Sequence, residues 1–172
     1  MRNNLLLTAC AVATVCFLLI IPAQMQNTSA TAVHKEKSMS TAHATGTFDV
    51  KVQPQTASEF ETANSLARYS LDKEIHGEME GTSKGEMLST SEASGVAAYV
   101  ALERVTATLN GRSGTFLLQH NASMTKTSQQ MQITVVPDSG TGQLIGITGT
   151  FTIKIVEKKH FYDFAYSLPA EN

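Results

Sequence analysis

Five polar or ionisable side chains could do chemistry together if the chain folds so that they share one face of a sheet: Lys73, Glu86, Tyr99, Glu103 and His120. A carboxylate and an imidazole within reach of a substrate can act as general base and acid. In a mostly apolar pocket, the same groups can orient a small ligand. A third interpretation is a buried structural network, because a buried charge is costly unless it is paired and hydrogen-bonded.

The strands that must position these residues are predicted by alternation of apolar and polar side chains after Gly46. The clearest stretches are 48–52, 69–79, 151–155 and 162–168, with further strands near 83–91, 96–109, 112–126 and 129–137. Residues 53–65 contain Pro54 and many polar side chains, which favours a loop. Short connections make sequential strands antiparallel, and one apolar face per strand requires closure. We therefore predict an all-β domain, a single small antiparallel β-barrel of about eight strands in meander order.

The register of the central hairpin follows from Asn110-Gly111, since both middle positions of a type I′ turn need positive φ. The resulting pairs are Leu109 with Arg112, Val105 with Phe116, Glu103 with Leu118, Ala101 with His120, Thr106 with Thr115 and Thr108 with Ser113. A second turn at Thr127-Ser128 would pair His120 with Val135, Ala122 with Ile133, Met124 with Met131, Asn121 with Thr134 and Ser123 with Gln132. Both turns give the same division into an inner and an outer face.

Under this register, Glu103 and His120 are diagonal neighbours on the apolar inner face, and Tyr99 is diagonal to His120. Lys73 interrupts the inner row of its own strand. A turn at Gly81-Thr82 would add Glu86 to the same face. These five residues are our candidates for ligand binding in the barrel interior, and no catalytic residue is assigned among them.

Several other chemistries lack support in the sequence. The five histidines (34, 43, 76, 120 and 160) show no zinc-site spacing, so we predict no metal and no cofactor. Gly140-Thr141-Gly142 resembles a phosphate-binding loop, but a strand-like stretch follows where such loops begin a helix, so a turn is expected. After residue 30, the chain has 12 basic and 15 acidic side chains and no basic patch with interleaved aromatic residues. Nucleic acid is therefore not an expected partner.

The first 30 residues have the layout of a secretory signal peptide: Arg2, an apolar stretch over Leu5–Ile21, and cleavage after Ala23 or Ala30. An uncleaved membrane anchor is the alternative, although a span needs about 20 apolar residues. Cleavage would remove Cys10 and Cys16, which excludes disulfides and thiol catalysis. We expect a flexible polar tether over 31–45, the barrel over 46–170, no membrane span after cleavage, and a secreted or periplasmic location.

An ordered run of short motifs resembles the bacterial family called domain of unknown function 3224. The motifs are Leu102-Glu103-Arg104-Val105, Gly111-Arg112-Ser113-Gly114-Thr115-Phe116, Leu118-Gln119-His120, Val135-Val136-Pro137 and Ser139-Gly140-Thr141-Gly142-Gln143-Leu144. The resemblance covers about 44–168 and implies an eight-stranded barrel similar to allene oxide cyclase and dirigent proteins. The family has no assigned reaction, so it implies no catalytic residue. Asp138 stands where a glycine is expected, and many relatives lack a signal peptide.

These patterns lead to one function and two alternatives. The leading hypothesis is an exported barrel that binds a small hydrophobic or amphipathic molecule in its interior. The first alternative is a cyclase- or isomerase-like enzyme in which Glu103 and His120 move protons around an apolar pocket. The second is an interaction module of the cell envelope that uses the barrel exterior or the tether. An oligomer is compatible with all three.

Overall fold

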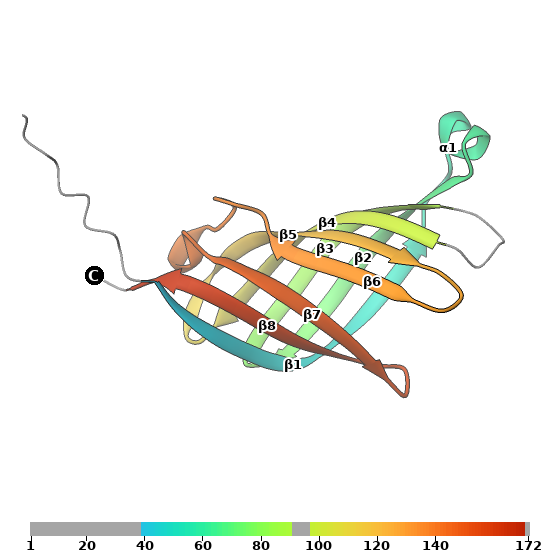
Figure 1. The fold of residues 1–172 in the computed structure, drawn as a ribbon. Helices are drawn as coiled ribbons and strands as arrows, with labels where there is room; N and C mark the ends of the chain where they lie inside the picture. The colour runs from blue at the N-terminus through green and yellow to red at the C-terminus, as the bar shows by residue number, and fades with distance from the viewer. Residues whose placement is uncertain (1–38, 91–96, 171–172) are drawn as a thin grey trace, which may run out of the picture. The chain divides into compact units, whose positions relative to one another are not determined.

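The chain forms a closed barrel in which every strand is antiparallel to its neighbours in the order β1 to β8 (Figure 1). The computed structural model describes residues 39–90 and 97–170. The strands are β1 Met39–Pro54, β2 Leu66–Gly77, β3 Met79–Thr90, β4 Ala97–Leu109, β5 Arg112–Met124, β6 Gln129–Val135, β7 Thr148–Val156 and β8 Lys159–Pro169. The predicted fold class, a meander barrel of eight strands, is confirmed.

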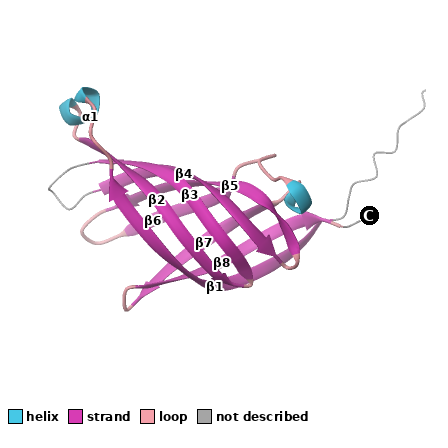
Figure 2. Ribbon diagram, turned by 180° about the vertical axis from the view of Figure 1, so that it is seen from behind, coloured by secondary structure: helices cyan, strands magenta, loops and turns pink. Residues whose placement is uncertain are grey.

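Two short helices lie at opposite ends of the barrel (Figure 2). Helix α1, Glu59–Ala63, lies in the segment predicted to be a loop. It forms because Ser58 and Glu61 make a reciprocal capping box that satisfies two backbone N–H groups. The 3₁₀ helix η1, Gly142–Leu144, lies in the glycine-rich segment, and strand β7 follows it.

The β4–β5 hairpin has the predicted register. Asn110 and Gly111 have φ values of 49° and 77°, as a type I′ turn requires. All six pairs predicted from this turn are confirmed, including Glu103 with Leu118 and Ala101 with His120.

The β5–β6 register differs from the prediction by two residues. His120 pairs with Ile133, not Val135, and Ala122 pairs with Met131. The reason is a loop of four residues, 125–128, whose ends are joined by the bond from the Thr125 N–H to the Ser128 carbonyl oxygen. A shift of two residues preserves the face of every side chain, because side chains alternate with a period of two.

The β2–β3 hairpin contradicts the prediction more seriously. The chain reverses at Glu78, between the end of β2 and the start of β3, and not at Gly81-Thr82. Ile75 therefore pairs with Gly81. This register is displaced by an odd number of residues from the predicted one, so every side chain of β3 lies on the face opposite to the one expected.

The N-terminal boundary of the barrel also differs from the prediction. Strand β1 begins at Met39 and pairs with β8 from Met39–Pro169 to Phe48–His160, so residues 39–45 of the predicted tether belong to the barrel. Pairing with β8 orders this polar stretch because the ladder satisfies its backbone groups. The predicted signal peptide, its cleavage sites and both cysteines lie outside the described residues. Within the described ranges, no helix is long and apolar enough to cross a membrane.

The core is concentrated at one end of the barrel, which we call the closed end. This end carries the turns at Glu78 and Asn110-Gly111, together with residues 136–147. Residues 136–147 extend along β5 through bonds from the Val136 N–H to the Leu117 oxygen and from the Thr141 N–H to the Thr115 oxygen. Its inner side chains are almost fully buried: Ala44, Met79, Leu109, Phe116, Leu144, Ile147, Phe164, Tyr166 and Leu168.

The opposite end, which we call the open end, carries α1 and the turns at 125–128 and 157–158. Here apolar residues that face inward remain exposed: Val52 by 48%, Met131 by 36% and Ile155 by 59%. Tyr69, Met87, Tyr99, Met124 and Ile153 are only half-buried. The barrel is thus filled at one end and incompletely filled at the other.

Candidate functional site

A buried carboxylate, Glu103, lies at the centre of the polar groups on the inner wall. Lys73 on β2, Ser83 on β3, Glu103 on β4 and His120 on β5 come from four consecutive strands, and all four are buried. Gly85 is the β3 partner of Glu103, and a Cβ there would lie 2.6 Å from the Cβ of Glu103. A glycine at this position therefore allows the backbones of β3 and β4 to approach closely beside Glu103.

The carboxylate of Glu103 accepts hydrogen bonds from three side chains. Lys73 Nζ lies 2.9 Å from Oε1 and 2.8 Å from Oε2. The Ser83 hydroxyl donates to Oε2 at 3.0 Å, and His120 Nε2 lies 3.1 Å from Oε1. The Lys73 ammonium also lies 4.9 Å from the centre of the Phe48 ring, a cation–π contact.

These neighbours keep Glu103 ionised. Burial alone would raise the pKa of this carboxyl, but the hydrogen bond from His120 and the charge of Lys73 outweigh burial and lower the pKa to about 2. An ionised carboxylate only accepts hydrogen bonds, so His120 Nε2 must carry the hydrogen between them. Both oxygens are already engaged, which makes Glu103 a poor general base at neutral pH.

The second ring nitrogen of His120, Nδ1, is the polar atom that the network leaves available. Within the described ranges, Nδ1 has no hydrogen-bond partner. No fully enclosed side-chain nitrogen or oxygen of those residues lacks a partner, so Nδ1 keeps some access to solvent. In the neutral ring, Nδ1 carries a lone pair and accepts a hydrogen bond.

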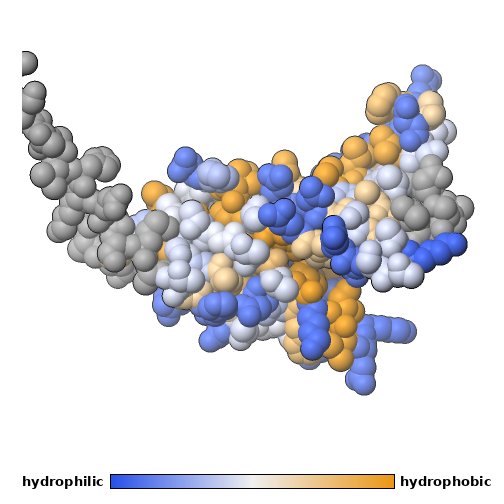
Figure 3. All heavy atoms as spheres, viewed as in Figure 1, coloured by the Kyte–Doolittle hydropathy of each residue, from blue (hydrophilic) through white to orange (hydrophobic). Residues whose placement is uncertain are grey.

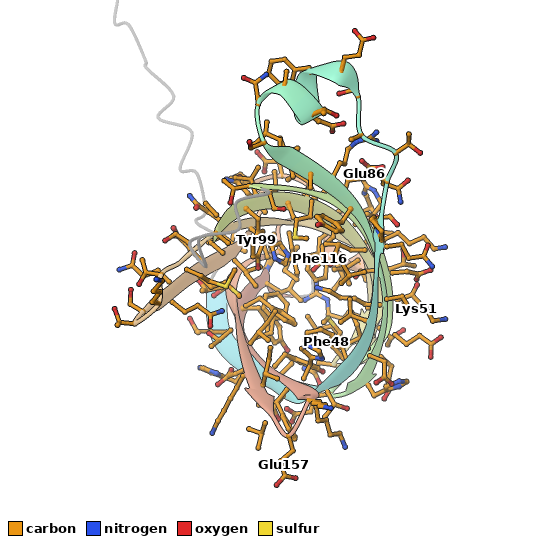
Figure 4. The ribbon with its side chains drawn as sticks, turned by 90° about the vertical axis from the view of Figure 1, so that its right-hand side faces the viewer. Phe48, Lys51, Glu86, Tyr99, Phe116 and Glu157 are labelled. Carbon is orange, nitrogen blue, oxygen red and sulfur yellow. The ribbon has the colours of Figure 1, made fainter. Side chains whose placement is uncertain are left out.

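Tyr99 is diagonal to His120 on the inner face, since Tyr99 pairs with Ala122 and His120 with Ala101. Its side chain points into the barrel (Figure 4) and is half-buried. Its hydroxyl makes no hydrogen bond to any residue that the structure describes. Burial and the charge of Glu103 raise the pKa of Tyr99, so the phenol stays neutral and can donate a hydrogen bond.

The prediction for Glu86 was wrong. The reversal at Glu78 places Glu86 on the outside of the barrel, where it is exposed (Figure 4) and lies 3.4 Å from Arg68. The same reversal places Ser83 inside, a member of the network that the sequence prediction missed. Gly77, with φ 119°, was the signal that could have located this turn.

A slot separates strands β6 and β7. The two strands pair only at Thr134 and Thr150, and they diverge toward the open end (Figure 1). A hollow of about 430 Å³ lies along the slot. Its apolar lining faces inward and consists of Met131, Ile133, Phe151, Ile153 and Ile155, and its polar lining consists of Gln129, Gln132, Thr150 and Thr152. Apolar surface is also visible where the β7–β8 hairpin ends (Figure 3), where Ile155, Val156 and Phe161 are exposed.

The slot adjoins the polar groups through the β5–β6 register. Ile133 pairs with His120, and Met131 pairs with Ala122, which in turn pairs with Tyr99. The slot lining and the available atoms of His120 and Tyr99 thus belong to two adjacent rows of the inner wall. His120 and Tyr99 lie in the strands beside the slot and do not line its hollow. An apolar wall with a few polar groups nearby is typical of small-molecule sites.

A second hollow, of about 540 Å³, lies on the outer face of β3, β4 and β5. Its floor includes Leu88, Val100 and Leu102, which are exposed by 37%, 55% and 54%. Arg68 contributes to its lining and bonds Glu61 of α1 at 3.2 Å, which ties the helix to the barrel. His120 is among the residues that line this hollow, whereas Lys73, Ser83, Glu103 and Tyr99 are not.

The chain matches a known family over most of the barrel. Residues 44–166 match the family described as Protein of unknown function (DUF3224). The chain belongs to the DUF3224 family. The crystal structure of a DUF3224 protein of unknown function from Shewanella oneidensis MR-1 is similar, with 41% identity and a TM-score of 0.68. The similarity covers 77% of this chain and 100% of that one. A comparison with curated proteins gave no match.

The groups most available for chemistry in this DUF3224 barrel are therefore His120 and Tyr99. Lys73 and Glu103 neutralise each other and hold the His120 ring in place through Nε2. None of the described residues form a cluster of histidine, cysteine, aspartate or glutamate suited to a metal ion. What remains is a site that can accept and donate single hydrogen bonds beside an apolar slot.

Proposed function

We propose that this DUF3224 protein binds a small, largely apolar molecule at the open end of the barrel, along the slot between β6 and β7. The observation that carries the proposal is the exposure of inward-facing apolar side chains there, with Met131 and Ile155 exposed by 36% and 59%. A molecule seated in the slot would remove this apolar surface from water, which is favourable by about 25 cal/mol per Å². The predicted signal peptide supports a location outside the cytoplasm for this binding.

The proposal can be tested with N-phenyl-1-naphthylamine, a neutral dye that fluoresces in apolar surroundings. The protein should enhance its fluorescence in a saturable way. Ile155→Glu places a charge on the inner side of the slot, and we expect it to weaken dye binding about tenfold, because one aliphatic contact is worth roughly 1.5 kcal/mol.

Lys154→Glu is the matched control, because Lys154 is the outward-facing neighbour on the same exposed part of β7. Its dye affinity should equal that of the wild type. Equal affinities for the two variants, or no enhancement by the wild type, would contradict binding in the slot.

A catalytic role is the alternative that the geometry supports less. Glu103 is ionised and fully hydrogen-bonded, so proton transfer would fall to His120, with Tyr99 as the neighbouring acid. The bond from Nε2 to Glu103 does orient the ring, as a base in a proton-transfer site requires. We therefore keep acid–base chemistry of the isomerase kind as the second candidate, to be tested by loss of turnover in His120→Gln with retained dye binding.

A further inference from the structure

We infer that the ligand of the open end is a neutral amphiphile with a hydroxyl head group, an alcohol rather than a carboxylate. The inference rests on the function proposed above and adds the chemical class of the ligand. It depends on the charges and unpartnered atoms on the inner wall beside the slot.

The charges of the inner wall disfavour an anion. The ammonium of Lys73 contacts both oxygens of Glu103 and the face of the Phe48 ring, so its charge is compensated by Glu103. The Lys73–Glu103 pair therefore has no net positive charge with which to attract a carboxylate placed beside His120. The other inward-facing basic group near the open end, His160, is stacked on Phe48 at 4.9 Å between ring centres, away from Tyr99 and His120 on strands β4 and β5.

The unpartnered atoms suit a hydroxyl group. His120 is 3% exposed, yet its Nδ1 has no partner among the described residues and retains access to solvent. In the neutral ring this atom accepts one hydrogen bond, and the neighbouring Tyr99 hydroxyl donates one. A ligand hydroxyl can donate to the first and accept from the second, whereas a carboxylate offers two acceptors and no donor.

The apolar part of the ligand would extend into the slot. Ile133 and Met131, on the slot, are the register partners of His120 and Ala122. From this position, the head group lies beside His120 and Tyr99 while the chain runs between β6 and β7 toward Ile153 and Ile155. Met131 and Ile155 are exposed along that path and Ile153 is half-buried, which suits an unbranched aliphatic chain.

The test is displacement of N-phenyl-1-naphthylamine at pH 8 by 1-decanol and by decanoate, which differ only in the head group. We expect decanol to displace the dye at a concentration at least tenfold lower than decanoate. Tyr99→Phe removes only the hydroxyl, and we expect it to weaken decanol binding roughly three- to tenfold, the value of one hydrogen bond, after correction for the dye affinity measured for that variant.

The outcomes separate the two proposals. If the dye does not bind, both the binding function and the head-group inference are wrong. If the dye binds but decanoate displaces it as well as decanol does, only the head-group inference is overturned. The same conclusion follows if Tyr99→Phe binds decanol as tightly as the wild type does.

Discussion

The two ends of this barrel share the same strands and the same alternation of side chains, yet only one end is filled. At the closed end, residues 136–147 extend along β5, and Leu144 and Ile147 join the core. At the open end, β6 and β7 separate beyond Thr134 and Thr150. The difference shows that the inner face beside β5 is buried where a further segment covers it, and that an uncovered stretch becomes a candidate site.

The largest expected difference is in the free energy of unfolding, between removal of an aromatic side chain at the closed end and removal of an aliphatic side chain at the open end. Phe116 is fully buried and stacked on Phe164 at 5.6 Å between ring centres, so Phe116→Ala should lower the free energy of unfolding by about 3–5 kcal/mol. Ile155→Ala should change it by less than about 0.5 kcal/mol. Urea denaturation of both variants measures the contrast, and similar losses would contradict the distinction between the ends.

Acid should have an intermediate effect on the free energy of unfolding. The residue responsible is Glu103, which lies between the two ends of the barrel. Its pKa is lowered from 4.5 to about 2 by His120 and Lys73, so its ionised form stabilises the fold. This contribution, on the order of 3 kcal/mol, is fully present above pH 4.5 and is lost as the pH falls toward 2. Urea denaturation between pH 7 and 2 measures the loss.

The double variant Lys73→Met with Glu103→Leu is the control for the acid effect. Replacing a buried ion pair with apolar residues of similar volume can be nearly neutral for stability. The double variant should therefore fold and lack the part of the acid dependence that belongs to Glu103. An unchanged pH profile in the double variant would show that other carboxylates account for the acid sensitivity.

The smallest expected changes in the free energy of unfolding come from substitutions in the two-residue turns at the two ends. At the closed end, Asn110-Gly111 suits positive φ, whereas at the open end Glu157 and Lys158 adopt φ values of 49° and 68° without a glycine. Lys158→Gly should raise the free energy of unfolding by about 1 kcal/mol, and Gly111→Ala should lower it by about as much. A Cβ at Gly111 would meet no atom within 4 Å, so its effect reports backbone strain alone. Thermal unfolding of both variants checks the signs.

Much of the fold could be predicted because it depends on local patterns. The Asn110-Gly111 turn was sufficient to pair Glu103 with Leu118 and Ala101 with His120. The β5–β6 register was wrong by two residues and still placed His120 inside, since an even shift preserves the face. The turn at Glu78 is marked by a single glycine, Gly77, a weaker signal than Asn-Gly, and the resulting odd shift moved Glu86 outside and Ser83 inside.

The candidate site was predicted in part. Lys73, Glu103 and His120 were expected on one face, and they form hydrogen bonds at 2.8–3.1 Å. Their roles could not be predicted, because the pKa of Glu103 depends on the balance between burial and the effects of His120 and Lys73. The sequence did not predict that Met131 and Ile153 line a site. Strands β6 and β7 are joined by residues 136–147 and not by a short turn, so no local signal indicates where the two strands separate.

The sequence by itself determined the strands, their meander order and the inward direction of Lys73, Tyr99, Glu103 and His120, because alternation and turn residues act over a few neighbouring positions. Only the tertiary structure decided which parts of the inner wall are covered. Closure brings β1 against β8 and residues 136–147 against β5, whereas β6 and β7 meet at a single pair. The polar atoms that remain available beside the slot follow from that closure, since burial and pairing depend on contacts between distant segments.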